Sequence, residues 1–283
     1  MLRIAIQSKG RLYEESMALL EEAGIKIPGG KRTLLVPARN FPVEVLFLRD
    51  DDIPESVASG VADVGIVGLN EVMEKRCPVG ILKKLGFGKC RLSLAIPQDI
   101  DYLDRNWFSG KKIATSYPGI LSDYLHKNEI VSDIHVITGS VEIAPGIRLA
   151  DAIFDIVSSG STLVSNRLKE VETVVESEAV LIGTDSISPE KRGILDELLF
   201  RFDSVQAADD KKYILMNVPQ KKLNDVLSVL PGIKSPTVMP LADKEWCSVH
   251  TVLDEKCFWE IINRLKTAGA EGILVLDIEK MIL

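Results

Sequence analysis

Residues 151–163, with the sequence DAIFDIVSSGSTL, decide the expected fold of this chain. The apolar residues around Asp155 predict a buried strand, and the small residues after Val157 predict a tight loop. Thr162 then begins a helix. A strand that runs through a short loop into a helix is the repeating unit of α/β folds, so this stretch predicts an α/β protein.

The rest of the chain repeats this alternation in two successive groups. The first group has expected strands at 2–6, 33–36, 43–48 and 63–68, and expected helices from Leu12 to Gly24 and from Asp50–Asp52 to Gly60. The second group has expected strands at 91–97, 112–115, 135–138 and 154–157, and expected helices at 119–127 and 147–152. Residues 174–175 and 179–182 predict strands that return to the first group, and 189–202 predicts an amphipathic helix.

Two such groups joined by crossing strands predict a two-lobed core, like that of periplasmic binding proteins, with a ligand cleft between the lobes. Lobe I is expected at 1–92 and 175–205, and lobe II, with the Ser/Gly loop, at 93–174. The last segment differs. Its expected elements follow the order β-α-β-β-α-β over 213–218, 221–230, 237–241, 247–253, 258–268 and 272–278. That order predicts a ferredoxin-like domain at 206–283, a frequent form of small-ligand regulatory unit.

Composition narrows the function classes. The chain has 283 residues, enough for two or three domains, and a formal net charge of −7. An acidic chain argues against a nucleic-acid partner, although local cations and backbone N–H groups still bind small anions. No apolar run approaches the length of a membrane span, and MLRIAIQSKGR carries no signal-peptide pattern, so we expect no membrane partner.

The cysteines and histidines do not form a metal-binding pattern. No pair of cysteines is spaced as C-x-x-C, and the three histidines are scattered. We therefore expect no structural zinc site and four free thiols, as in a cytoplasmic protein: Cys77, Cys90, Cys247 and Cys257.

The Ser/Gly loop has the composition of a phosphate site. Small residues let the backbone curl so that several N–H groups face one anion, and the following helix dipole and hydroxyls add to the attraction. Asp155, just before the loop, is placed to accept a hydrogen bond from a sugar hydroxyl. Together they predict a site for a ribose 5-phosphate, formed by Asp155 and Ser158, Ser159, Gly160, Ser161 and Thr162. The spacing alone also fits an ordinary Ser/Gly turn with a helix cap.

Several motifs, in order along nearly the whole chain, resemble the ATP phosphoribosyltransferase family. The central one is GSVEIAP at 139–145, followed by LADA at 149–152 and DIVSSGSTL at 155–163. The others are QSKGR at 7–11, LRDDDIP at 48–54, LGFGKCRLSLA at 85–95, IATSYP at 113–118 and SPTVMPLA at 235–242. The C-terminal module is similar to that of the long form, which needs no separate regulatory subunit. One departure is Arg148, where the family has a small residue, usually Gly.

The resemblance implies a reaction that joins N1 of the adenine of ATP to C1 of phosphoribosyl pyrophosphate and releases pyrophosphate, the first step of histidine biosynthesis. Adenine N1 has a free lone pair, so no nucleophile–base pair is needed. Asp155 and Asp151 are the candidates to stabilise the oxocarbenium-like ribose, with Asp155 preferred. Mg²⁺ is expected with the pyrophosphate, with no ligand set predicted. By resemblance, Lys9, Arg11 and Glu142 join the phosphoribosyl pyrophosphate site; solvated surface cations are the alternative for Lys9 and Arg11.

The resemblance also implies a nucleotide site and a regulatory site. ATP is expected to contact Arg49, Gly68, Asn70, Thr115 and Tyr117, although Tyr117 also suits core packing. Histidine, as an inhibitor, is expected to contact Asn217, Thr237, Ala242 and Gly272, for which ordinary loop roles are the alternative. The family forms dimers that associate into hexamers.

Two other functions stay open from the residues. A solute-binding receptor has a similar two-lobed cleft, but usually carries an export signal and lacks an acid beside a phosphate loop. A regulatory homologue that binds without turnover is also possible if Arg148 faces the cleft. The run Asp50–Asp52 suits a metal or a helix cap, with the cap preferred, and Cys90 is expected to be structural.

Overall fold

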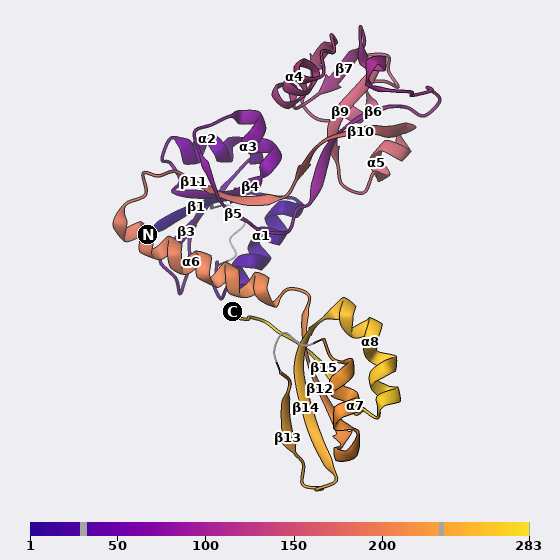
Figure 1. The fold of residues 1–283 in the computed structure, drawn as a ribbon. Helices are drawn as coiled ribbons and strands as arrows, with labels where there is room; N and C mark the ends of the chain where they lie inside the picture. Colours follow the sequence, from indigo (N-terminus) through magenta and orange to yellow (C-terminus); the bar gives the residue numbers. More distant parts are fainter. Residues whose placement is uncertain (29–32, 232–234, 283) are drawn as a thin grey trace. The chain divides into compact units, whose positions relative to one another are not determined.

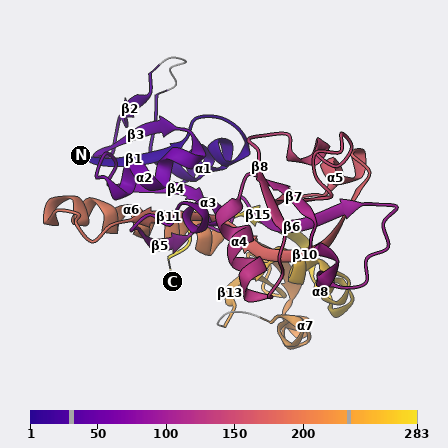
Figure 2. The same cartoon turned by 90° about the horizontal axis from the view of Figure 1, so that it is seen from above.

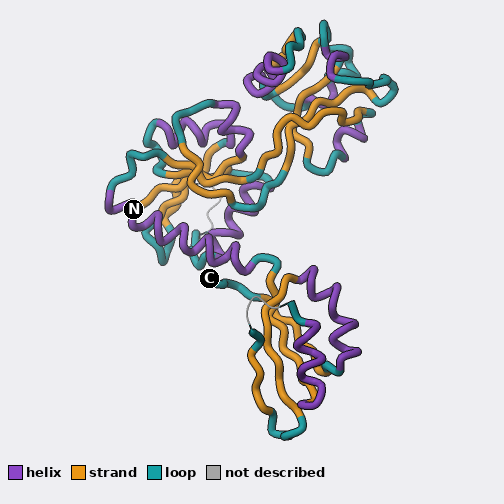
Figure 3. Tube along the Cα trace, in the orientation of Figure 1, coloured by secondary structure: helices purple, strands orange, loops and turns teal. Residues whose placement is uncertain are grey.

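The fold is taken from a computed structural model that describes residues 1–28, 33–231 and 235–282. The chain divides into two compact units, Met1–Glu197 and Leu198–Leu283 (Figure 1). The first unit contains two β-sheets with helices, and the second contains one. Figure 3 shows the strands gathered into these separate sheets.

The first sheet has six strands among the described residues, in the order β2-β3-β1-β4-β11-β5. Strand β1 lies parallel to β3 and β4, whereas β2, β11 and β5 run antiparallel to their neighbours. The strands are β1 (Leu2–Gln7), β2 (Leu35–Pro37), β3 (Val43–Leu48), β4 (Val64–Gly68), β5 (Gly80–Lys84) and β11 (Ala179–Gly183).

Helices cover the first sheet because the central strands are apolar on both faces. On one face, α2 (Ile53–Ala58) and α3 (Leu69–Lys75) pack against residues such as Ala5, Val67 and Ile182. A short 3-10 helix, η1 (Asp50–Asp52), precedes α2. Helix α1 (Arg11–Glu22) follows β1 (Figure 2). Gly24 ends this helix with a φ of 76°, as the sequence predicted.

The second sheet has the strand order β10-β6-β9-β7-β8. Its strands are β6 (Cys90–Pro97), β7 (Lys112–Thr115), β8 (Asp133–Val136), β9 (Ala152–Val157) and β10 (Leu168–Ser177). Val174 and Val175, expected to return to the first sheet, instead belong to β10, where Val175 pairs with Leu92. Two apolar residues fit either sheet, but β10 stays paired with β6 as far as Ser177. The chain therefore returns to the first sheet only with β11, which pairs with β4.

The two faces of the second sheet bury different residues. Leu92, Leu94 and Phe154 pack with α4 (Pro118–Lys127) and η2 (Arg105–Phe108), whereas the alternate residues Ala95 and Ile153 pack with η3 (Val141–Ile143) and α5 (Ser161–Ser165). Figure 2 accordingly shows α4 and α5 apart from one another on this lobe. This period-two alternation positions α5, and hence the loop that precedes it, on one face of the sheet.

One predicted helix is wrong. Residues 147–151 form turns and bends, not a helix, and Ala152 already begins β9. Pro145 and Gly146 disfavour a helix there, and Arg148 adopts a left-handed φ of 61°. The N–H of Leu149 donates to the carbonyl of Ala144 at 2.9 Å, which closes the turn.

The second unit has the predicted β-α-β-β-α-β order, and its sheet order β13-β14-β12-β15 is that of the ferredoxin-like fold. It follows α6 (Pro189–Ala208) and is formed by β12 (Lys211–Pro219), η4 (Gln220–Lys222), α7 (Leu223–Val229), β13 (Thr237–Pro240), β14 (Trp246–Asp254), α8 (Glu255–Ala268) and β15 (Glu271–Asp277). Its core lies between the sheet and the two helices. The expected architecture, a two-lobed periplasmic-binding-protein-like core plus a ferredoxin-like module, is confirmed.

Candidate active site

The Ser/Gly loop connects β9 to α5 as predicted. Gly160 adopts a φ of 79°, which turns the chain directly into the helix. The Oγ atoms of Ser159 and Ser161 lie 2.9 Å apart, and the N–H of Ser161 also reaches Ser159 Oγ at 3.4 Å. Ser158, Ser159, Ser161 and Thr162 are all exposed. A left-handed residue at a helix start, with hydroxyls on both sides, forms an accessible concavity of the kind that binds phosphate.

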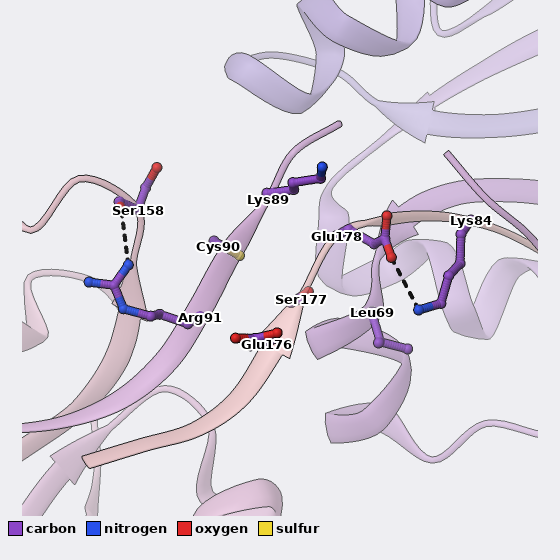
Figure 4. A pocket seen from close by; sticks show the side chains of 9 residues that line it. All are labelled: Leu69, Lys84, Lys89, Cys90, Arg91, Ser158, Glu176, Ser177 and Glu178. Atoms are coloured by element: carbon purple, nitrogen blue, oxygen red, sulfur yellow. Dashed lines mark hydrogen bonds and ion pairs between the residues drawn. The ribbon is translucent and has the colours of Figure 1, made fainter. Parts of the chain in front are cut away.

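Two cavities adjoin this loop. One, of about 590 Å³, is lined by Ser159–Ser161, Leu163 and residues of β10. The other, of about 480 Å³, is lined by Leu69, Lys84, Lys89, Cys90, Arg91, Ser158, Glu176, Ser177 and Glu178 (Figure 4). Arg91 lines both cavities, so a ligand could approach the loop from either cavity, with Arg91 between them.

Asp155 lies near the loop end of β9, opposite Ser93 of β6. The residue is half-buried, and this burial raises the pKa of its carboxyl group to about 6, with the charge of Glu142 acting in the same direction. A hydrogen bond from the N–H of Ile156, at 2.8 Å, opposes the rise. Asp155 is therefore a carboxylate near neutral pH that is poorly solvated, which strengthens its interaction with a nearby positive charge.

The structure does not bring Asp151 to the loop. Asp151 precedes β9, and four residues along a strand span about 13 Å. Its carboxylate accepts a hydrogen bond at 2.9 Å from the N–H of Lys112, and its own N–H donates to the Lys112 carbonyl at 2.8 Å. These bonds give Asp151 a role at the start of β7, so the geometry favours Asp155 as the site carboxylate.

Arg91 and Glu170 were not among the predicted site residues. The Nε and Nη2 atoms of Arg91 each donate to Glu170 at 2.5 Å, and its Nη1 donates to the Ser158 carbonyl at 3.2 Å. Ser93 Oγ also donates to Glu170 at 2.7 Å. Arg91 in turn holds the pKa of Glu170 at about 2. The signal missed was the alternation of polar Arg91 and Ser93 in an otherwise apolar strand.

One cation from the first lobe, Arg11, also reaches the loop. Lys9 and Arg11 flank Gly10, whose φ of 91° makes the turn between β1 and α1. Arg11 Nη1 donates to Ser158 Oγ at 3.3 Å, while its Nε pairs with Glu15 at 2.9 Å. Lys9 is exposed in the same turn. The expected proximity of Arg11 to the phosphate loop is therefore present in the fold.

Asn70 and Tyr117 meet in a buried polar network. The hydroxyl of Tyr117 donates to Glu71 Oε1 at 2.8 Å and accepts from Asn70 Nδ2 at 3.2 Å. Ser177 Oγ donates to Asn70 Oδ1 at 2.8 Å. Burial raises the pKa values of both Glu71 and Tyr117. The Tyr117 ring belongs to the core of the second lobe, which is the packing role that the sequence left open.

The other residues expected near ATP have varied surroundings. Thr115 is fully buried, and its Oγ1 accepts from the N–H of Tyr117 at 2.8 Å. A Cβ on Gly68 would lie 2.3 Å from Asn70 Oδ1, so this glycine makes room for the network. Arg49 is exposed and pairs with Asp51 at 3.2 Å. Cys90 is half-buried and burial raises the pKa of its thiol, which suits a structural role.

Metal ligation was expected without a ligand set. Among the described residues, no group of three or more His, Cys, Asp or Glu is arranged to hold a metal ion. In the Asp50–Asp52 run, Asp51 pairs with Arg49 and lies 3.8 Å from Lys75 Nζ, which agrees with the expected surface role. The expected capping role is not seen, because Asp52 makes no side-chain hydrogen bond to the start of α2.

In the C-terminal module, the structure brings together two of the four predicted regulatory residues. A Cβ on Gly272, whose φ is 57°, would lie 3.4 Å from Asn217 Nδ2. Thr237 begins β13, and Ala242 lies two residues after the end of this strand. Strands β14 and β12 lie between β13 and β15. Thr237 and Gly272 therefore lie on the two edge strands of this sheet, which are three strand spacings of about 4.8 Å apart.

Comparison with known proteins decides the family. The family model described as ATP phosphoribosyltransferase matches residues 49–204, and the model of its C-terminal domain matches residues 208–280. This chain belongs to the ATP phosphoribosyltransferase family, in its long form. As a member of that family it is an enzyme of the glycosyltransferase type.

Relatives match over full length. An ATP phosphoribosyltransferase of Bacteroides fragilis is 70% identical over 283 residues, which is 100% of both chains. One from Cytophaga hutchinsonii is 58% identical over 281 residues, covering 99% of this chain and 98% of the relative. A solved structure, described as the ATP phosphoribosyl transferase (HisG:HisZ) complex from Thermotoga maritima, is 27% identical with a TM-score of 0.61, covering 71% of this chain and 98% of that one.

The family assignment agrees with Asp155 on β9 and with the Ser/Gly loop that follows this strand. No helix in the described ranges has both the length and the apolar character needed to span a membrane.

Proposed function

We propose that the chain transfers the phosphoribosyl group of phosphoribosyl pyrophosphate to N1 of the adenine of ATP, the first step of histidine biosynthesis. The observation that carries this proposal is the half-buried Asp155 on β9, directly before an exposed phosphate loop bordered by Arg11 and Arg91. The names of the full-length relatives support it.

The reaction forms one bond and breaks one. The N1 lone pair attacks C1 of the ribose while the bond from C1 to the pyrophosphate oxygen breaks, and its electron pair leaves with pyrophosphate. Positive charge develops on the ribose in between, and Asp155 is the carboxylate placed to stabilise it. The adenine afterwards loses a proton from its N6 amino group. A carboxyl group with a pKa of about 6 is also suited to accept that proton near neutral pH.

The ribose 5-phosphate is proposed to bind at Ser158–Thr162, with Glu142 and Asp155 toward the sugar. Lys9 and Arg11 are proposed to attract the pyrophosphate group, because Lys supplies a point charge and Arg a forked set of donors. Mg²⁺ usually completes its shell with waters and substrate phosphates. In this proposal Mg²⁺ would enter with the pyrophosphate and would neutralise charge on the leaving group, with no ligand set assigned to this chain.

ATP is proposed to bind on the side of the cleft where β4 and β7 end. The buried network places Asn70 beside Tyr117 and fixes Thr115 behind it. Arg49 and Gly68 lie on the same lobe as Asn70. In this arrangement Arg49, whose surface ion pair with Asp51 is weak, is available to a triphosphate.

Histidine is proposed to inhibit the enzyme through the ferredoxin-like module. Asn217 beside Gly272 offers an amide to a small amino acid, because a glycine there leaves the space free. Thr237 and Ala242 belong to the opposite edge of that sheet, so they are proposed to contact histidine from a second copy of the chain in the assembly. Inhibition requires that histidine favour one of two states, which the dimers and hexamers of the family would supply.

The test is formation of phosphoribosyl-ATP from ATP, phosphoribosyl pyrophosphate and Mg²⁺, with a pyrophosphatase present to draw the reaction forward. Wild type should form product that histidine suppresses, and Asp155→Ala should form at least 100-fold less. Asp151→Ala is the matched control and should keep most activity. Asn217→Ala should keep activity and lose histidine sensitivity. Folded wild type that neither forms product nor binds phosphoribosyl pyrophosphate would overturn the proposal.

A further inference from the structure

Helix α3 of the first lobe directly contacts the start of helix α4 of the second lobe. The carboxylate of Glu74, on α3, accepts two hydrogen bonds from α4: Gly119 N–H reaches Oε1 at 2.8 Å, and Ile120 N–H reaches Oε2 at 2.9 Å. These N–H groups lie in the first turn of α4, where a helix has no partners of its own. A carboxylate there also meets the positive end of the helix dipole.

Gly119 makes this approach possible. A Cβ at position 119 would lie 3.0 Å from Glu74 Oε1 and 3.2 Å from its Cδ. A side chain at this position would therefore push the carboxylate away by a few tenths of an ångström, which would weaken its bonds to the two N–H groups. This contact joins two lobes whose sheets are separate, so it is no part of the strand pairing of either sheet.

Two further contacts join the same helices. Glu71, one turn before Glu74, accepts from the Tyr117 hydroxyl at 2.8 Å. Arg76, just after α3, donates to the Gly119 carbonyl at 3.0 Å and to Asp123 at 2.7 Å. The three contacts surround the start of α4. We call them the α3–α4 latch.

The chain otherwise passes between the two sheets only twice among the described residues. It leaves the first sheet after Lys84 and enters the second at Cys90, and it returns between Ser177 and Ala179. Two adjacent strand connections of this kind permit one lobe to rotate against the other, as in hinge closure around a ligand. The latch opposes that rotation because it ties helices outside the connecting strands.

We propose that the α3–α4 latch fixes the angle between the lobes before substrates bind, with Glu74 as its central positioning residue. The inference rests on the proposed function, because the fixed angle presents Asn70 and the phosphate loop to one pair of substrates. A protein whose competent conformation is only partly populated binds with an affinity lowered by that fraction. Loss of the latch therefore weakens substrate binding and leaves the chemical step, which Asp155 serves, nearly unchanged.

The kinetic test compares Glu74→Ala, Glu74→Gln and Gly119→Ala with wild type. Glu74→Ala should raise KM for both substrates about tenfold and change kcat less than threefold, since only the populated fraction of the competent state changes. Glu74→Gln keeps one acceptor oxygen and should recover part of the affinity. Gly119→Ala displaces the carboxylate and should behave like Glu74→Ala. Glu260→Ala, at an exposed position on α8, is the matched control and should leave both constants unchanged.

A distance measurement tests the latch without relying on activity. Spin labels at Glu22→Cys and Lys127→Cys, both exposed, report on the two lobes in full-length protein with its native cysteines replaced by alanine. Labelled chains are diluted with unlabelled protein so that each pair lies in one chain. With the latch intact, the distance distribution should be narrow and nearly unaffected by phosphoribosyl pyrophosphate. Glu74→Ala should broaden it, and substrate should narrow it again.

The outcomes are distinguishable. A narrow distribution in Glu74→Ala, with unchanged KM values, would overturn the latch whatever the activity of the enzyme. A lower thermal stability with unchanged KM and distances would show that Glu74 is merely structural. A broadened distribution in a protein that makes no phosphoribosyl-ATP would support the latch and overturn the proposed function instead.

Discussion

Arg91 and Glu170 form a two-point ion pair, with Nε and Nη2 of the guanidinium each 2.5 Å from a carboxylate oxygen. The pair joins β6 to β10, and its third nitrogen donates to the carbonyl of Ser158 in the phosphate loop. Such forked pairs fix the plane of the guanidinium, and so the loop is held at its first residue. Glu170 therefore influences the loop through Arg91, and it also lines the cavity of about 590 Å³ beside the loop.

Glu170→Gln should weaken binding of phosphoribosyl pyrophosphate. The amide keeps one acceptor but loses the charge, and hydrogen bonds to charged groups contribute roughly 1.5–3 kcal/mol. We expect KM for this substrate to rise about tenfold, with a smaller change in kcat. The measurement is initial-rate kinetics at saturating ATP.

The control for that variant is Glu172→Gln, on the same strand, whose carboxylate accepts from the Tyr102 hydroxyl at 2.7 Å. It should leave KM for phosphoribosyl pyrophosphate unchanged, because an amide oxygen still accepts that bond. Equal effects of the two variants would show that strand stability, not the position of Arg91, controls the loop.

Asp155→Asn should inactivate the enzyme and stabilise the fold. Burial raises the pKa of Asp155 from its ordinary value of 3.8 to about 6. The folded protein therefore binds this proton more tightly than the unfolded chain, and stability is lost as pH rises from about 4 through 6. Above pH 7 the asparagine variant should gain about 1–3 kcal/mol in free energy of unfolding. Urea unfolding at pH 4 and pH 8 should show the gain only at pH 8.

The raised pKa of Asp155 also predicts how the activity falls at low pH. If ionised Asp155 stabilises the ribose cation, kcat/KM should fall as pH decreases through about 6, since the protonated form carries no charge. The profile is measured with a stable buffer series and constant ionic strength. A limb at an ordinary aspartate pKa, or none between pH 5 and 8, would contradict this role.

Gly68→Ala should destabilise the protein by about 2 kcal/mol, as for other overpacked interiors. The added Cβ would lie 2.3 Å from Asn70 Oδ1, an atom held by Ser177. Denaturant unfolding measures the change. Gly193→Ala is the matched control, since its Cβ meets nothing within 4 Å and the residue lies in α6; it should be neutral or stabilising. An unchanged midpoint for Gly68→Ala would mean that the network is looser than the fold implies.

Arg148→Gly should raise stability slightly and leave kinetics unchanged. Arg148 is exposed and adopts a φ of 61°, a conformation that costs a non-glycine residue about 1–2 kcal/mol. Glycine loses more conformational entropy on folding than arginine, which offsets part of the relieved strain. We therefore expect the free energy of unfolding to rise by up to about 1 kcal/mol. Arg148→Ala keeps the strain and should show no gain. A changed KM for either substrate in both variants would show instead that the side chain contributes to the pocket.

That result would also explain the one departure from the family pattern. The backbone at position 148 favours glycine for conformational reasons, because the chain turns there before β9. The family preference for a small residue is therefore accounted for by φ, without any contact to a ligand.

The sequence alone determined most of the strands and the Ser/Gly loop before α5, but it missed α3 and β5 and wrongly predicted a helix at 147–152. Strands such as 43–48 and 112–115 were predicted to the residue, because apolar runs bounded by breakers form buried strands in most contexts. Glycines at 24 and 160 mark left-handed positions for the same local reason. The β-α-β-β-α-β order also fixed the ferredoxin-like module, since few topologies satisfy it.

Only the tertiary structure decided which residues meet. The sequence offered both Asp151 and Asp155, with Asp155 preferred, and the extended β9 places only Asp155 beside the loop. Glu170 is 79 residues from Arg91, and Glu74 is 45 from Gly119, so no local pattern predicts either contact. Local preferences act over a few residues, whereas strand pairing and lobe contact bring distant side chains together. The site and the α3–α4 latch therefore follow from the fold.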